Sequence, residues 1–404
     1  MKMSKILAFV LVAVMLVSCC AGLVGCKKTE TITIWVSEVD GAADLARTQV
    51  DRFLAAHPEY DYEIVIEGVS EADAATNVLT DVNEAADIYC FAQDQLARLV
   101  QASALAAPAG NAATTVKNDN DAISVSAASV GGTLYAYPLT SDNGYFLFYD
   151  KSIVKDPTSM EAILADCAAA DKKFGFEVEG SGWYTASFFF GTGCRSDWTT
   201  NEEGDFTGVN DTFSDEVRGF AAIKGLSYLT QHSAYVNASK IVDGIGAVVS
   251  GTWISKDAAT YFGDNFGVTK LPSFTVDGTS YQLGSFSGNK LMGVKPQEDA
   301  DRAAFCSELA LYLTNTECQL ERYETLGWGP SNKAAQSNEA VKADAALGAL
   351  AAQGAHAIPQ GQIHGKWWDI ATALAASSRT CTTDEELKRA LATYKASIDS
   401  LFAE

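Results

Sequence analysis

The sequence predicts an α/β fold, and two observations carry that prediction. In the first third of the chain, short segments rich in β-branched and aromatic residues alternate with helical segments of about 10–15 residues. This alternation is typical of βαβ units, which build a parallel sheet covered by helices on both faces. The chain has 404 residues, of which 48% are hydrophobic, so it is long enough for a sizeable core and for two or three domains.

The first elements follow from local patterns. Residues 31–36, Thr-Ile-Thr-Ile-Trp-Val, have the composition of a strand, and residues 62–66 alternate between apolar and polar side chains. Between them, apolar residues recur at helical spacing until shortly before Pro58. In order, we expect a strand at 31–36, a helix at 44–56, a strand at 62–66, a helix at 71–82, a strand at 86–91 and a helix at 94–105.

The rest of the chain continues the α/β pattern and then becomes mainly helical. The final helix has apolar residues at spacings of four and three, and Thr383 with Glu386 forms a plausible capping box at its start. The expected elements are a hairpin leading to a strand at 131–138, strands at 145–150, 247–250 and 266–271, and helices at 216–230, 299–313 and 383–402.

The N-terminus has the layout of a bacterial lipoprotein signal. A short basic start precedes an apolar stretch, and Leu-Val-Gly leads into Cys26. We therefore expect residues 1–25 to be a signal peptide, Cys26 to carry lipid, and residues 26–30 to form a lipidated tether. Cys19 follows a similar pattern, but the apolar run ends at Cys26. A plain secretory signal and a single membrane-spanning helix are the alternatives.

Charge and composition limit the partners. Removing residues 1–25 removes two lysines, which leaves 27 basic and 51 acidic residues and a net charge of −24. Such an acidic surface argues against nucleic acid or anionic lipid as a partner. We expect a monomer outside the cell membrane that meets the membrane through its lipid anchor alone.

No cofactor or metal site is expected. The sequence has no Gly-x-Ser-x-Gly elbow, phosphate loop or dinucleotide fingerprint. Its four histidines are dispersed, and its cysteines show no Cys-x-x-Cys spacing. Six cysteines follow Cys26, and both disulfides and buried free thiols are compatible with the pattern.

Aromatic residues beside polar groups are the main candidates for a site. A sugar ring has an apolar face that suits flat aromatic side chains, and a rim of hydroxyls that suits amides and carboxylates. Adjacent tryptophans at 367 and 368 are hard to bury together, because neighbouring residues point in different directions. The predicted loop groups are Phe91 with Asp94, Asp142-Asn143-Gly144-Tyr145, Trp183-Tyr184, Trp253, Trp328 and Trp367-Trp368.

The order of these segments resembles bacterial extracellular solute-binding proteins of the maltose-binding type, the external receptors of ABC sugar importers. The resemblance covers roughly residues 31–402. The segments that carry it are the opening strand at 31–35, residues 86–94, Tyr135 to Pro138 with Asp142-Asn143 and Tyr149 to Lys151, Gly251-Thr252-Trp253, residues 327–332, and residues 358–360 with Trp367-Trp368.

The resemblance implies two α/β lobes that close on a ligand by a hinge motion. It places the N-lobe at residues 31–139 plus 285–329 and the C-lobe at 144–283 plus 332–404, with crossovers near 139–144, 283–287 and 328–333. The closed receptor would dock on the transmembrane subunits of an ABC permease, whose ATPase is a separate protein. It implies no catalytic residues.

The resemblance also implies roles for individual residues. Tryptophans 183, 253, 367 and 368 would stack on sugar rings. The ligand-binding residues expected are Glu38, Phe91, Asp94, Asp142, Asn143, Trp183, Tyr184, Trp253, Trp328, Trp367 and Trp368.

Two departures from the family pattern bear on the ligand. Gln95 stands where the maltose-binding proteins carry arginine, and Trp183 stands where they carry tyrosine. These changes weaken maltose itself as the ligand and leave an oligosaccharide, with a maltodextrin favoured. The alternatives are a non-sugar solute bound by the same fold, and a surface-anchored glycoside hydrolase.

Overall fold

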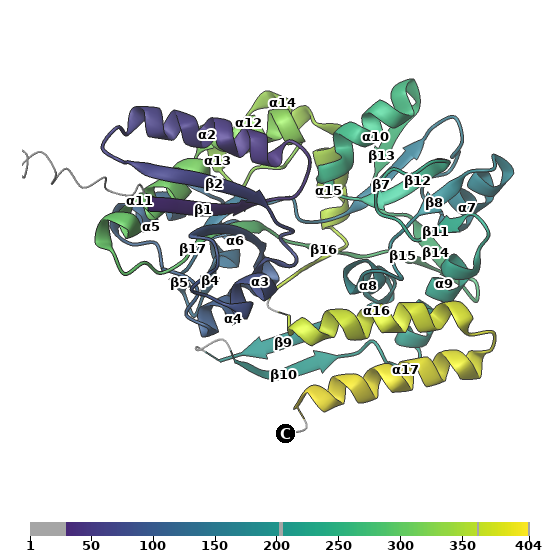
Figure 1. The fold of residues 1–404 in the computed structure, drawn as a ribbon. Helices are drawn as coiled ribbons and strands as arrows, with labels where there is room; N and C mark the ends of the chain where they lie inside the picture. The colour runs from purple at the N-terminus through teal and green to yellow at the C-terminus, as the bar shows by residue number, and fades with distance from the viewer. Residues whose placement is uncertain (1–29, 202–204, 362, 403–404) are drawn as a thin grey trace, which may run out of the picture.

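The computed structural model describes residues 30–201, 205–361 and 363–402. Its elements gather around two five-stranded sheets in separate halves of the molecule (Figure 1). We call the first sheet with its helices the N-terminal lobe, and the second the C-terminal lobe. The predicted α/β class with a helix-flanked sheet in each lobe is confirmed. The residues predicted to form a signal peptide, with Cys19 and Cys26, lie outside the described residues.

The N-terminal sheet has the strand order β2-β1-β3-β17-β6. Strand β1 runs parallel to both β2 and β3, as predicted, but β17 runs antiparallel to β3 and β6. The prediction of a purely parallel sheet is therefore wrong, because β17 enters this sheet from the other lobe and in the opposite direction. The strands are β1 (Glu30–Val36), β2 (Tyr62–Gly68), β3 (Ile88–Ala92), β6 (Tyr137–Thr140) and β17 (Lys290–Val294).

Helices cover the N-terminal sheet and bury an apolar core against it. Ile32 and Ile34 of β1 are completely buried, as is Phe305 of α11. The elements besides the sheet are α2 (Ala42–Ala56), α3 (Ala74–Thr80), η1 (Gln93–Gln95), α4 (Leu96–Gln101), α5 (Gly110–Asp119), α6 (Ala122–Ala127), the short hairpin β4 (Ser129–Val130) and β5 (Thr133–Leu134), α11 (Ala300–Leu313) and α12 (Thr316–Leu326).

The C-terminal sheet is also mixed, with the order β11-β8-β12-β7-β13. Strand β12 is parallel to β8 and antiparallel to β7, which is antiparallel to β13. The strands are β7 (Phe146–Asp150), β8 (Lys173–Gly175), β11 (Tyr235–Val236), β12 (Ile245–Ser250) and β13 (Phe266–Thr269). Two hairpins accompany them, β9 (Ser196–Thr200) with β10 (Phe206–Asp211), and β14 (Ser273–Val276) with β15 (Thr279–Gln282).

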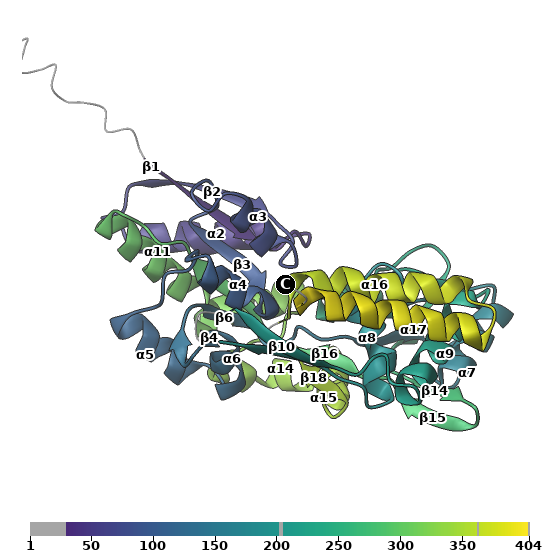
Figure 2. The ribbon, with the colours of Figure 1, turned by 90° about the horizontal axis from the view of Figure 1, so that it is seen from below.

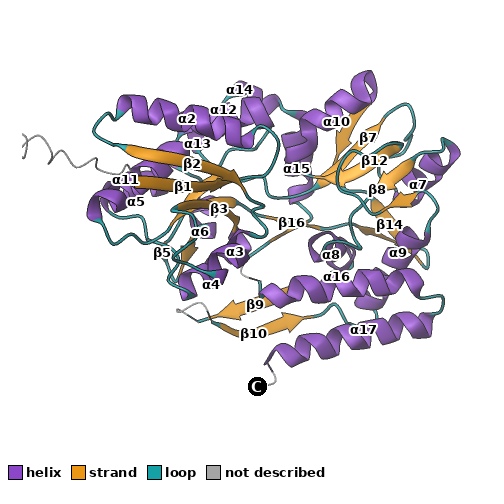
Figure 3. Ribbon diagram, viewed as in Figure 1, coloured by secondary structure: helices purple, strands orange, loops and turns teal. Residues whose placement is uncertain are grey.

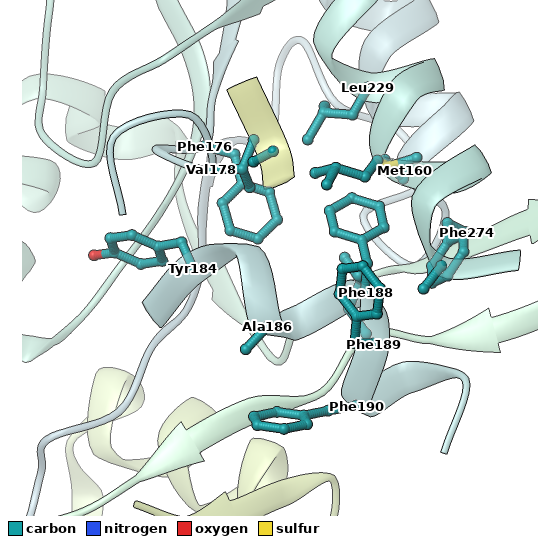
Figure 4. Packing of buried hydrophobic residues seen from close by; sticks show 14 of the residues in the cluster. Met160, Phe176, Val178, Tyr184, Ala186, Phe188, Phe189, Phe190, Leu229 and Phe274 are labelled. Atoms are coloured by element: carbon teal, nitrogen blue, oxygen red, sulfur yellow. The ribbon is translucent and has the colours of Figure 1, made fainter. Parts of the chain in front are cut away.

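Helix α8 passes through the core of the C-terminal lobe. Phe188, Phe189 and Phe190 are at most 6% exposed. Figure 4 shows Phe188 with Leu229 and Phe274 on one side of α8 and Phe190 on the other. The helices of this lobe are α7 (Met160–Ala169), α8 (Gly182–Gly191), α9 (Arg218–Gln231), η2 (Thr252–Ile254), α10 (Ser255–Phe262), η3 (Gly263–Asn265), α15 (Ala345–Gly354), α16 (Gly365–Thr380), α17 (Asp384–Asp399) and η4 (Ser400–Phe402). Two short helices precede α15: α13 (Lys333–Gln336) packs against α12 of the N-terminal lobe, and α14 (Glu339–Ala343) follows it.

The last two long helices, α16 and α17, lie side by side along the C-terminal lobe (Figure 2). The predicted capping box at the start of α17 is confirmed, because Thr383 accepts from the Glu386 backbone N–H and the Glu386 side chain accepts in return from the Thr383 backbone. Leu387 and Leu391 are buried on the inner face of α17.

The chain crosses between the lobes three times. The crossings are the loop from β6 to β7, the segment of β16 (Ser285–Ser287) before β17, and residues 327–332 after α12. Strand β16 pairs in parallel with β18 (Ala357–Pro359) and runs between the two lobes (Figure 3). Residues from all three crossings therefore meet at the junction of the lobes.

The six cysteines after Cys26 are free thiols in the described structure, and five of them are buried. The sequence was compatible with disulfides and with free thiols, and the described structure has free thiols. Within the described ranges, we find neither a helix long and apolar enough to cross a membrane nor a cluster of three side chains suited to a metal ion.

Candidate functional site

The candidate site lies where strands from both lobes end near the crossings. Strand β3 leads into Gln93, Asp94 and Gln95, and β12 leads through Gly251 into Trp253. The carboxyl ends of strands in α/β sheets are the usual place for ligands, because the loops that follow them converge there. The predicted loop residues Asp94 and Trp253 therefore lie in the expected part of the fold.

Gln360, just after β18, joins side chains from several elements. Its Nε2 donates to Asp94 Oδ1 at 2.8 Å, and its Oε1 accepts from Asn143 Nδ2 and from Trp183 Nε1, each at 3.3 Å. Asp94 belongs to the N-terminal lobe and Trp183 begins α8 in the C-terminal lobe. Gln360 thus connects the lobes by side-chain hydrogen bonds. Sequence analysis placed it in a family segment but assigned it no role.

The Asp94 carboxyl is the most perturbed acid of this group. It is 6% exposed, and burial raises its pKa to about 7. The charge of Arg98 opposes that rise most strongly, and hydrogen bonds from Trp368 and Gln360 oppose it less. A carboxyl with this pKa both accepts and donates hydrogen bonds near neutral pH, so it suits the hydroxyl groups of a neutral ligand.

Two half-buried tryptophans from the C-terminal lobe face each other beside this network. The ring centroids of Trp183 and Trp253 are 6.0 Å apart, and the edge of Trp183 packs on Tyr145 at 4.4 Å. Trp368 of α16 is also half-buried. Because these three side chains are partly exposed, each retains apolar surface for a ligand. We call Asp94, Gln360, Trp183, Trp253 and Trp368 the interlobe site.

A buried lysine at the edge of the interlobe site was missed by sequence analysis. Lys290, the first residue of β17, is 6% exposed. Its Nζ lies 3.4 Å from Glu71 Oε1, 5.4 Å from the centroid of the Trp253 ring and 4.2 Å from that of Trp328. The sequence gives one hint, a lysine opening an otherwise apolar strand. Lys290 adds a cationic donor to the wall of the site.

Asp142 holds the crossings together. One carboxylate oxygen accepts from the backbone N–H of Gly329 at 2.7 Å and from Thr252 Oγ1 at 2.5 Å. These partners lie in the third crossing and in η2, so Asp142 ties the first crossing to both. Asn143, its neighbour, instead reaches the interlobe site through Gln360.

Four of the predicted aromatic ligand residues are buried, and their ligand roles stay predictions. Phe91 and Trp367 are completely buried, and Trp328 and Tyr184 are 3% and 5% exposed. Trp367 turns into the core of the C-terminal lobe, where its Nε1 donates to Tyr394 Oη at 3.0 Å. Only Trp368 of the adjacent pair keeps exposed surface, because consecutive helical residues point in different directions.

Glu38 and Gln95 differ in their exposure to solvent. Glu38 is exposed in the loop after β1. Gln95, which stands in place of the family arginine, is 2% exposed; its Oε1 accepts from Ala75 N in the first turn of α3 at 2.8 Å, and its Nε2 donates to the Glu71 carbonyl before α3 at 2.6 Å. The amide of Gln95 therefore stabilises a loop of the N-terminal lobe.

A separate cavity of about 470 Å³ lies against the crossings. Asp142, Asn143, Ser285 and Gly329 line it from the crossings, and Leu347 lines it from α15. It contains none of the exposed tryptophans. Because its aromatic lining is limited to Phe286, it is a poorer match to a sugar ring than the interlobe site.

These features indicate the class of protein. A solute-binding receptor has two α/β lobes joined by crossings, with hydrogen-bonding and aromatic side chains between the lobes. The family model for bacterial extracellular solute-binding proteins matches residues 48–349, and the chain belongs to that family. The resemblance inferred from the sequence is confirmed at this level, and the family is one of receptors rather than enzymes.

Solved structures support the same fold. A structure solved with acarbose is 28% identical, covers 92% of this chain and 100% of its own, and superposes with a TM-score of 0.79. A maltodextrin-binding protein from L. casei BL23 is 21% identical over 92% of this chain and 99% of its own, with a TM-score of 0.74. A maltotriose-binding protein of Thermus thermophilus is 17% identical over 92% and 100%, with a TM-score of 0.77. No curated protein matches the sequence.

Proposed function

We propose that this receptor captures an oligosaccharide, with a maltodextrin favoured, and delivers it to an ABC permease. The observation that carries the proposal is the interlobe site, where Trp183 and Trp253 present aromatic faces beside the Asp94–Gln360 hydrogen bond. The structure solved with acarbose, at 28% identity, adds support for a carbohydrate.

The roles in this proposal follow from exposure and bonding. Trp183, Trp253 and Trp368 stack on the apolar faces of sugar rings. Asp94, with Asn143, Glu38, Gln360 and Lys290, binds hydroxyl groups. Three buried aromatic residues pack against these side chains: Tyr184 against Trp183, Trp367 against Trp368, and Trp328 against Lys290. Phe91, which is also buried, flanks the wall of the N-terminal lobe in this proposal.

Lobe closure is the proposed mechanism of capture. We take the N-lobe as 31–139 plus 285–329 and the C-lobe as 144–283 plus 332–404, so that movement is absorbed in the three crossings. Only the closed form contacts the ligand from both lobes, and the ligand therefore favours closure. The Gln360 bonds to Asp94 and Trp183 join the same two lobes that a ligand would join.

The setting of the receptor is also a proposal. Lipid attached to Cys26 would hold the protein outside the cell membrane, and two or more acyl chains are needed for a stable anchor. The transmembrane subunits of the permease would receive the closed receptor, and the acidic surface disfavours nucleic acid as a partner.

A ligand panel tests the function. All described elements lie between Glu30 and Phe402, so a protein starting at residue 27 keeps the whole fold. Maltose, maltotriose, longer maltodextrins, acarbose and unrelated oligosaccharides are titrated against it while tryptophan fluorescence is followed. We expect saturable binding of a maltodextrin without product formation.

Two results would contradict the proposal. The absence of binding by every sugar, together with binding of a charged solute, would favour a non-sugar receptor. Release of new reducing ends would indicate hydrolysis.

A further inference from the structure

A second, much smaller cavity lies inside the N-terminal lobe and takes no part in the interlobe site. Its volume is about 30 Å³. This exceeds the roughly 10–15 Å³ that one water-sized occupant requires. Most of its lining is apolar, and the polar exceptions include Ser37, Gln49, Arg322 and the indole of Trp328.

Two residues that line this cavity each have a buried hydrogen-bond donor without a partner in the described chain. Arg322 Nη1 and Trp328 Nε1 are both buried and form no hydrogen bond within the described chain. Arg322 is 7% exposed and Trp328 is 3% exposed, so solvent at the surface cannot serve them. An unpaired buried donor is destabilising, and a charged one is more so. An occupant that accepts from both donors would remove this destabilisation.

The charge of Arg322 decides the kind of occupant. Its Nη2 donates to the Leu313 carbonyl, but no carboxylate of the described residues forms an ion pair with it. The nearest candidate along the helix, Glu321, is engaged by Arg52 at 2.5 Å and by Gln49 at 2.9 Å. Glu321 attracts Arg322 only from a distance, and a buried guanidinium without a carboxylate in direct contact is strongly destabilising.

The thiol next to the cavity does not supply the missing charge. Burial raises the pKa of Cys90 to about 12, so this lining residue stays neutral. A water molecule would satisfy the two donors but would leave the guanidinium charge uncompensated. Phosphate and larger anions exceed the space.

We propose that this cavity is a binding site for a small monovalent anion, with chloride as the simplest occupant. The anion accepts from Arg322 Nη1 and Trp328 Nε1 and neutralises the buried guanidinium. Arg322 belongs to α12, and Trp328 follows it in the third crossing. The bound ion therefore fastens the third crossing to the N-terminal lobe.

Thermal unfolding tests the site. The protein starting at residue 27 is unfolded in sodium chloride, in sodium bromide and in sodium gluconate, whose anion is too large to enter, at equal ionic strength. Chloride should raise the Tm in a saturable way over gluconate, by about 2 °C at ten times its Kd. Equal Tm values in chloride and gluconate would overturn the proposal.

Matched variants locate the effect. Arg322→Met removes the cation and keeps a long side chain, so the chloride response should vanish. Arg52→Met is the control, because it removes a neighbouring arginine that already has Glu321 as its partner, and it should keep the response. If Arg322→Met does not fold, Trp328→Phe removes one donor and should weaken chloride binding several-fold.

Crystals soaked in bromide give a direct readout. We expect an anomalous peak within hydrogen-bonding distance of Arg322 Nη1 and Trp328 Nε1. A cavity that holds only water, without anomalous signal, would contradict an anion site.

Discussion

Single side chains at the interlobe site carry the proposed function, and Trp253 is the sharpest of them. It is half-buried, and its ring centroid lies 6.0 Å from that of Trp183 and 5.4 Å from Lys290 Nζ. Trp253→Ala should weaken oligosaccharide binding roughly 5- to 150-fold, taking the stacking of planar rings on aromatic side chains as a guide. Trp35→Ala is the control, because Trp35 bonds to Glu67 on the first sheet. Equal affinities of the two variants would remove Trp253 from the site.

The raised pKa of Asp94 makes the stability of the protein depend on pH. Its pKa is raised to about 7 by burial, whereas an unfolded aspartate titrates near about 3.9. Between these values the folded protein holds a proton that the unfolded chain has released. The stability contributed by Asp94 is therefore full below about pH 4 and is lost as the pH rises toward about 7.

Asp94→Asn should flatten the fall of Tm between pH 5 and pH 7 that this ionisation causes. Asp215→Asn is the control, because hydrogen bonds from Arg218 lower the pKa of Asp215 to about 2. The contribution of Asp215 is constant above about pH 4, so its loss should lower Tm equally at pH 5 and pH 7. If the Tm of Asp94→Asn falls between pH 5 and pH 7 as steeply as that of the unsubstituted protein, the raised pKa of Asp94 is refuted.

Part of the site could be predicted from residue types. The candidates Asp94, Trp183 and Trp253 could be singled out because aromatic and polar residues adjoin in segments with family resemblance, and their ligand roles stay predictions. Lys290 and Gln360 gave little local signal, since a lone lysine in an apolar strand and an amide in a loop acquire their roles through long-range contacts. The burial of Trp367 depends on the rotation of α16, which its sequence neighbours do not decide.

At the scale of elements, α8 and α16 position the tryptophans by close packing. A Cβ atom on Gly182 would lie 2.6 Å from the Trp368 carbonyl oxygen and 2.8 Å from Ala371 Cβ. Because backbone atoms cannot move aside cheaply, Gly182→Ala should push the helices apart, cost about 1–3 kcal/mol in the free energy of unfolding and weaken sugar binding.

Gly348→Ala is the matched control for that helix contact. Gly348 lies in α15, and an added Cβ would meet nothing within 4 Å. This substitution should be neutral or stabilise by up to about 1 kcal/mol. Urea unfolding measures both variants, and equal stability of the two would contradict the packing argument.

The capping box of α17 gives a second prediction for an element. Thr383→Ala leaves a backbone N–H of the first turn without its acceptor, so it should cost about 1 kcal/mol in the free energy of unfolding. Thr393→Ala, at an exposed position of the same helix, should cost little. Denaturant unfolding measures the free energy of unfolding of both variants. Similar losses of stability in the two would mean that the cap contributes nothing.

The elements were predictable where local periodicity was strong. The strand expected at 31–36 and the helix expected at 299–313 match β1 and α11 within one residue. Helix α8 was not predicted, because its sequence is apolar all round and has no helical stripe. The antiparallel directions of β17 and β7 follow from the path of the chain between lobes, which local patterns do not record.

At the scale of the whole molecule, the charge separates two kinds of ligand. The protein without residues 1–25 carries a net charge of −24. Binding of a neutral sugar should change little between 0.05 and 0.5 M salt, roughly, because screening acts on charges. A charged solute would bind with an affinity that depends strongly on salt.

Calorimetric titration of maltotriose into the protein starting at residue 27, at low and at high salt, is the most direct test of the central claim. The account predicts saturable one-to-one binding with an affinity that is unchanged by salt, and with no hydrolysis product. Absence of binding by maltotriose and longer maltodextrins at either salt concentration would contradict it.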